Sequence, residues 1–91
     1  MLTIFAVSDS IGETAEQVAE AAASQFSENV EVRRIPYVKS LEDVQELIND
    51  IKSCENAMIV STIITVNVRE YLTQKCIESN VSIVNVLGPI I

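Results

Sequence analysis

The sequence predicts an α/β domain built on a four-stranded parallel sheet. Along its 91 residues, short apolar runs alternate with segments whose apolar residues recur at three- and four-residue steps. These are the patterns of buried strands and amphipathic helices. The predicted order is β-α-β-α-β-α-β, which is typical of right-handed crossovers that place helices over a parallel sheet. No repeat or linker divides the chain, so we expect residues 1–91 to form a single domain.

The polarity of the four predicted strands indicates their places in the sheet. Residues 2–7 and 57–60 are almost entirely apolar, as expected of interior strands. Residues 30–35 alternate apolar with charged side chains and are followed by Pro36, which favours an edge position. The last strand is predicted at residues 81–86. We therefore expect the spatial order 2-1-3-4 of flavodoxin-like sheets, in a three-layer or partly covered arrangement.

Three amphipathic helices are predicted between these strands. The first follows a capping box of Ser10 and Glu13, the second begins at Ser40, and the third is capped by Thr65 and ends at Asn80. Their expected buried stripes are Ala15, Val18, Ala19, Ala22 and Phe26; Leu41, Val44, Leu47, Ile48 and Ile51; and Val68, Tyr71, Leu72 and Cys76.

Right-handed crossovers leave part of this sheet without a helix. The first helix covers one face alone, so that face is expected to be bare over the third and fourth strands. The apolar residues 87–91 also have no following segment to cover them. An exposed apolar surface of this kind indicates a partner, so we expect either a missing C-terminal segment or a second copy in a homodimer.

Composition excludes several classes of partner. A formal net charge of −7 argues against nucleic acid and anionic membranes. No apolar stretch approaches the roughly 20 residues that span a bilayer, and the N-terminus lacks the features of a secretory signal. We therefore expect a cytoplasmic protein. Cys54 and Cys76 lack the spacing of a zinc site and the chain has no His, so no metal site is expected.

Candidate site residues follow the first and third predicted strands. In open parallel sheets ligands bind beyond the carboxyl ends of the strands. Hydroxyl groups and backbone N–H groups at a helix start suit a phosphate, and the candidate ligand-binding residues are Ser8, Ser10, Gly12, Thr14, Ser61 and Thr62. Asp9 is the candidate catalytic residue: its carboxylate could accept a proton, hold Mg²⁺ or only organise the turn.

Two observations weigh against phosphate binding at this loop. Asp9 and Glu13 place negative charge where the phosphate would lie, and helix capping alone explains Ser10 and Glu13. Neither GxGxxG nor GxxxxGK[ST] occurs anywhere in the chain.

Four segments together carry a more specific signal. Residues 7–16 (VSDSIGETAE), 34–38 (RIPYV), 69–72 (REYL) and 87–91 (LGPII) closely resemble the N-terminal part of the bacterial pyruvate, phosphate dikinase regulatory proteins. The resemblance implies a bifunctional kinase–pyrophosphorylase that phosphorylates a Thr of the dikinase with ADP as donor. It also implies the reverse reaction, a phosphate-dependent removal that releases pyrophosphate, and relatives of the family act on phosphoenolpyruvate synthase.

The resemblance also implies what this chain lacks. Members of the family are longer, and their Gly-rich nucleotide phosphate loop lies in the C-terminal portion, which no position here matches. ADP or ATP and phosphate are therefore implied as ligands of the full-length protein, with no cofactor in this chain, and a C-terminal kinase domain as its missing partner. We expect the 91-residue chain to be inactive alone.

Three functional hypotheses remain open at this point. The first is an enzyme fragment, the N-terminal domain of the dual kinase and pyrophosphorylase. The second is a module that binds a phosphate-bearing small molecule at residues 8–14 without chemistry. The third is an interaction module that dimerises through the bare sheet face.

Overall fold

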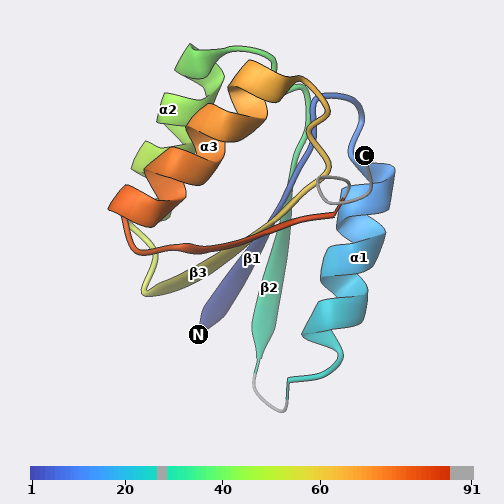
Figure 1. Ribbon diagram of the computed structural model, residues 1–91. Coiled ribbons are helices and arrows are strands. Elements are labelled where there is room, and N and C mark those ends of the chain that lie inside the picture. The colour runs from blue at the N-terminus through green and yellow to red at the C-terminus, as the bar shows by residue number, and fades with distance from the viewer. Residues whose placement is uncertain (27–28, 87–91) are drawn as a thin grey trace.

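Four parallel strands form the centre of the molecule (Figure 1). The computed structural model describes residues 1–26 and 29–86. The elements are β1 (Leu2–Val7), α1 (Glu13–Ala23), β2 (Val30–Ile35), α2 (Leu41–Ile51), β3 (Asn56–Ser61), α3 (Val66–Glu78) and β4 (Ser82–Asn85). Every strand pair is parallel and the spatial order is β2-β1-β3-β4, so the predicted fold class and strand order are confirmed.

The register of β1 explains why this strand is the most apolar. Ile4 lies opposite Val32 on β2 and Met58 on β3. Because β1 has a strand on each side and helices over both faces, its side chains from Thr3 to Val7 are buried. At the β2 edge Arg33 and Arg34 remain exposed, which confirms the edge position that the charged alternation predicted.

Helices cover the two faces of the sheet unequally. On one face, Ala15 and Ala19 of α1 share an apolar cluster with Ile4, Ala6 and Val60. On the other face α2 and α3 lie side by side (Figure 1). Their buried side chains form the larger cluster, which includes Phe5, Val44, Leu47, Ile48, Ile51, Ile59, Val68, Leu72 and Cys76.

The predicted bare flank is present over β4 but not over β3, where Val60 is buried in the same cluster as Ala15 and Ala19 of α1. In register with Met58 and Val60 of β3, Ser82 and Val84 point to the α1 face. Both side chains are exposed, and Val84 retains 48% of its accessible surface. Within residues 1–26 and 29–86, therefore, α1 does not extend across this flank. The apolar segment 87–91, which entered the same prediction, lies outside the described residues.

The capping box predicted for the first helix is wrong. Gly12 is the N-cap of α1, and no side chain caps the helix. The Ser8 hydroxyl instead accepts a hydrogen bond from the backbone N–H of Ser10 (3.0 Å) and lies 3.2 Å from the Ser10 hydroxyl. Because Ser8 holds Ser10 in this short turn, the N-cap lies two residues later than predicted, at a glycine whose φ of +87° other residues rarely adopt.

Three further side chains differ from their predicted roles. Phe26 lies beyond the end of α1 and is exposed, because the helix stops at Ala23. Leu41 is the first residue of α2, where the first turn directs it to solvent. Thr65 is the N-cap of α3 as predicted, but its side chain makes no capping bond. Asn80 adopts a left-handed φ of 59° directly after α3, as predicted for a helix end.

The second helix has the capping box that its sequence predicts. The Ser40 hydroxyl accepts a hydrogen bond from the Asp43 N–H (3.1 Å), and the Asp43 carboxylate accepts one from the Ser40 N–H (3.2 Å). The same carboxylate accepts a bond from the Lys39 N–H (3.0 Å). This bond from Lys39, followed by those with Ser40, lowers the pKa of Asp43.

We expect part of the acid sensitivity of the fold to come from Asp43. Its folded pKa lies below the unfolded value of about 3.9, so the stabilisation is present above that pH and is lost as the pH falls through the folded pKa. Asp43→Asn should unfold in less urea than the wild type at neutral pH, and the difference should shrink in acid. Glu42→Gln, at an exposed neighbour, is the control. A difference for Asp43→Asn that does not change with pH would contradict this assignment.

Candidate functional site

A cavity of about 250 Å³ opens at the carboxyl edge of β1 and β3. Its lining consists of Ser8, Asp9, Ser10, Thr14, Thr62 and Ile64. Two larger cavities, of about 320 and 360 Å³, lie at the opposite edge, where the strands begin. Ligands of open parallel sheets bind at the carboxyl edge, and five of the residues that the sequence singled out meet there. This cavity is therefore the candidate site.

The loop after β1 (residues 8–12) and the loop after β3 (residues 62–65) form most of the cavity, and backbone hydrogen bonds that continue the strand pairing hold them in place. The Thr62 N–H donates to the Val7 carbonyl oxygen (3.0 Å), and the Ser8 N–H donates to the Ile35 carbonyl oxygen (3.1 Å). These bonds continue the sheet one residue beyond β3 and β1, so Ser8 and Thr62 are buried. Ser8 and Thr62 are thus the buried part of the cavity lining, and Ser10 and Thr14 are its exposed part.

Asp9 joins the two loops through its carboxylate. Its Oδ2 accepts hydrogen bonds from the Ile64 N–H (2.9 Å) and the Thr65 N–H (3.4 Å), and lies 3.4 Å from the Thr65 hydroxyl oxygen. Asp9 therefore organises a turn, but the turn belongs to the β3–α3 loop, 55 residues away in sequence. Its carboxylate also lines the cavity, where a part in proton transfer or Mg²⁺ binding stays a prediction.

Two of the candidate ligand-binding residues do not line the cavity. Gly12 is buried at the start of α1, and an added Cβ atom would lie 3.3 Å from Cγ of Arg34, so this position lets α1 approach β2. Ser61 is buried in β3, and its hydroxyl accepts a hydrogen bond from the Ile63 N–H (3.3 Å). Gly12 and Ser61 therefore support the two loops without lining the cavity.

Ile64 is a site residue that sequence reasoning missed. It lines the cavity and is 63% exposed, between the buried Ile63 and the N-cap Thr65. The sequence did contain a signal: Ile64 is an apolar residue just before the start of the third helix, and it does not belong to the buried stripe of that helix. The hydrogen bond from its backbone N–H to Asp9 forms only because β1 and β3 are paired, so the sequence alone could not predict it.

The cavity contains a carboxylate and no cation. None of the chain's six lysines and arginines is in its lining. Arg34 Nη1 pairs with the Glu16 carboxylate at 3.1 Å, and Lys39 Nζ lies 5.7 Å from the centre of the Tyr37 ring. With four hydroxyl-bearing residues, the cavity offers hydrogen-bond donors and acceptors but nothing positive to stabilise a transferred phosphoryl group.

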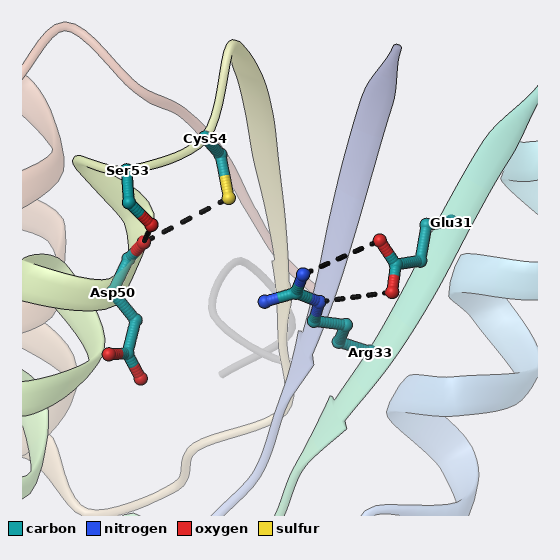
Figure 2. Close-up of polar contacts among 5 residues, drawn as sticks. All are labelled: Glu31, Arg33, Asp50, Ser53 and Cys54. Atoms are coloured by element: carbon teal, nitrogen blue, oxygen red, sulfur yellow. Dashed lines mark hydrogen bonds and ion pairs between the residues drawn. The ribbon is translucent and has the colours of Figure 1, made fainter.

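Arg33, the third cation of this region, is committed on the face that α2 covers. Figure 2 shows its guanidinium facing the Glu31 carboxylate of the same strand, with Nε 3.2 Å from Glu31 Oε2. Opposite this pair, the side chains of Ser53 and Cys54 point to the backbone carbonyl oxygen of Asp50. The hydrogen bond with Glu31 raises the pKa of Arg33.

Other reactive groups in the described part of the chain offer no second site. Burial raises the pKa of the Cys76 thiol to about 11, so the thiolate that reacts or binds metal is not formed near neutral pH. Residues 1–26 and 29–86 contain no group of three side chains placed to hold a metal ion. No helix among them is both long and apolar enough to cross a membrane.

Comparison with known proteins identifies the family. Residues 4–91 match the model of the family described as kinase/pyrophosphorylase. The chain belongs to the kinase/pyrophosphorylase family.

Relatives in this kinase/pyrophosphorylase family match the chain along its whole length. Proteins named as pyruvate, phosphate dikinase regulatory proteins are 80% identical in Clostridium perfringens strain SM101, 72% in Clostridium beijerinckii and 57% in Clostridium tetani, each over all 91 residues. The chain spans 34% of the length of each of these curated relatives. The resemblance seen in the four sequence segments is thus confirmed.

We expect Asp9→Ala to loosen the β3–α3 loop. Removing a carboxylate that accepts two backbone N–H groups should lower the free energy of unfolding by about 1 kcal/mol. Amide hydrogen exchange at Ile64 should become about tenfold faster, because its acceptor is lost. Glu13→Ala, at an exposed carboxylate of the same loop region, should leave that exchange rate unchanged. Unaltered exchange at Ile64 in Asp9→Ala would show that the carboxylate does not hold this loop.

Proposed function

We propose that this chain is the supporting, substrate-positioning part of an enzyme that regulates pyruvate, phosphate dikinase. In this proposal the intact enzyme phosphorylates the dikinase with ADP as donor, and reverses the modification with phosphate, releasing pyrophosphate. Membership of the kinase/pyrophosphorylase family and the names of the clostridial relatives support it. The proposal includes a cytoplasmic location, because that is where a metabolic dikinase would be met.

The observation that carries the supporting role is the composition of the cavity. Phosphoryl transfer needs cationic groups around the transferred phosphoryl and a cradle for the nucleotide phosphates. The cavity supplies hydroxyls, one carboxylate and one apolar side chain. We therefore assign the cationic groups, and the binding of ADP or ATP, to the part of the family's polypeptide that lies beyond the 34% spanned here.

The proposal gives the cavity residues a role that needs no charge of their own. Hydroxyls of Ser8, Ser10, Thr14 and Thr62 can orient a phosphoryl oxygen or a substrate hydroxyl. Asp9, fixed by two backbone N–H groups, keeps the two hydroxyl-bearing loops at a constant separation. Such positioning contributes to rate by holding the reacting groups in a productive arrangement.

A second candidate function is the binding of a phosphate-bearing small molecule without chemistry. The hydroxyl-rich lining favours it, and the exposed β4 flank with Val84 would then serve a homodimer. The negative charges of Asp9 in the lining and Glu13 at the start of α1 oppose it, because an anion entering the cavity meets a carboxylate and no cation. The supporting role in a larger enzyme therefore fits the charges better.

The test compares this chain with a full-length relative. Dikinase is incubated with ADP labelled in its β-phosphate, the group that is transferred as AMP leaves, and with either the 91-residue chain or the full-length C. perfringens protein, which is 80% identical over these 91 residues. We expect label on the dikinase only with the full-length protein. Label transferred by the 91-residue chain would contradict the supporting role. Absence of transfer by the full-length protein would contradict the proposed activity.

A further inference from the structure

Exposed apolar side chains are concentrated at the carboxyl edge of the sheet, where the candidate cavity opens. In the described part of the chain nine large apolar side chains are exposed, and five of them lie in the loops and first helical turns at the carboxyl edge of the sheet. We call these five the apolar rim: Ile11, Tyr37, Leu41, Ile64 and Val66. Figure 1 shows that the three loops carrying them, after β1, β2 and β3, lie at one end of the molecule.

Backbone hydrogen bonds connect two members of the rim, Tyr37 and Ile64, to residues that line the cavity. The Tyr37 N–H donates to the carbonyl oxygen of Ser10, beside Ile11 (2.9 Å). The Ile64 N–H donates to Asp9 on the other side of the same loop. Both partners, Ser10 and Asp9, line the cavity. Tyr37 and Ile64 therefore flank the cavity on the sides of β2 and β3.

Tyr37 is presented to solvent by a backbone conformation that aromatic residues rarely adopt. Its φ is 59°, and its side chain is 55% exposed. Hydrogen bonds from the N–H groups of Tyr37 to Ser10 and of Val38 to Ser8 hold this turn in place. Backbone strain of this kind concentrates at functional sites, and tyrosine is among the residues that dominate binding at interfaces.

The length of the family's members favours one occupant for the rim. Relatives that match all 91 residues are about three times as long, since the chain spans 34% of them, so most of each polypeptide lies outside the part described here. On the proposed function, on which this inference rests, the cationic groups missing from the cavity are used in every turnover. The two thirds of the relatives' length that lie outside this chain are a source that is always present, and a negative cavity beside Asp9 is complementary to cationic groups.

We propose that the apolar rim is the surface on which the remaining polypeptide of the intact enzyme docks, bringing cationic side chains over the cavity. Docking places the Tyr37 ring and Ile64 in the interface and closes the cavity against water. The hydroxyls of Ser8 and Thr62 then face positive charge in a low-dielectric site, where electrostatic interactions are stronger than in solvent.

The test measures how accessible the rim is in a full-length protein. In a chimera, this chain replaces the matching 91 residues of the C. perfringens relative. Cys54→Ser leaves the buried Cys76 as the native thiol of this part, and exposed cysteines of the remainder are replaced by serine. Ile64→Cys then reports on the rim, and Ile77→Cys, on α3 away from it, is the matched control. In this structure the two side chains are comparably exposed, at 63% and 73%.

We expect maleimide to label Ile64→Cys at least about tenfold more slowly than Ile77→Cys in the native chimera. In urea the two thiols should react at equal rates, which controls for intrinsic reactivity. The aligned positions of the unmodified relative give a second measurement should the chimera not fold.

Equal labelling of the two sites in the native protein would overturn the proposal. So would protection of Ile64→Cys that disappears on dilution, which indicates a second copy, or that appears only when dikinase is added, which indicates the substrate protein. The comparison of the two sites is made without ADP, and dikinase is added only in a separate arm, so failure of the labelling result is distinguishable from failure of the proposed kinase activity.

Discussion

Parallel pairing of β1 with β3 is the constraint on which the rest of the structure depends. These strands are 54 residues apart in sequence, yet the register sets Leu2 opposite Asn56 and Val7 opposite Ser61. Because both run in the same direction, their carboxyl ends reach the same edge together, and the loops that follow must share one space. The pairing also creates the buried centre of the sheet, since it leaves β1 with a strand on each side and helices above and below.

The candidate site is a consequence of that pairing and inherits its limits. The loops after β1 and β3 supply hydroxyls and a carboxylate. One oxygen of that carboxylate, Oδ2 of Asp9, accepts hydrogen bonds from two N–H groups of the opposite loop. The basic residues of the neighbouring β2 edge are engaged elsewhere, Arg33 with Glu31 and Arg34 with Glu16. The cavity therefore has hydroxyls in fixed positions but a negative charge from Asp9, in a chain whose formal net charge is −7. On the proposed function, the positive charge that phosphoryl transfer needs comes from outside these residues.

Patterns local to one segment predicted most of the fold, and contacts between segments decided the rest. Continuous apolar runs located β1 and β3, and Ser40 with Asp43 located the start of α2, because each depends on neighbouring residues. The Ser10–Glu13 capping box failed because the Ser8 hydroxyl, at the end of a strand, competed for the backbone of Ser10. For the site, position in the topology predicted five of the lining residues. The bond from Asp9 to the Ile64 N–H was not predictable, because it exists only after β1 and β3 pair.

The most direct test of this account is a map of amide-proton contacts across the sheet, measured by the nuclear Overhauser effect. The account predicts contacts that link Phe5 to the neighbourhoods of both Arg33 and Ile59, in the pattern of parallel strands on either side of β1. It also predicts that β4 contacts β3 alone among the described strands. Antiparallel contacts between β1 and β3, or contacts that place β4 beside β1, would separate the two loops and remove the basis for the site.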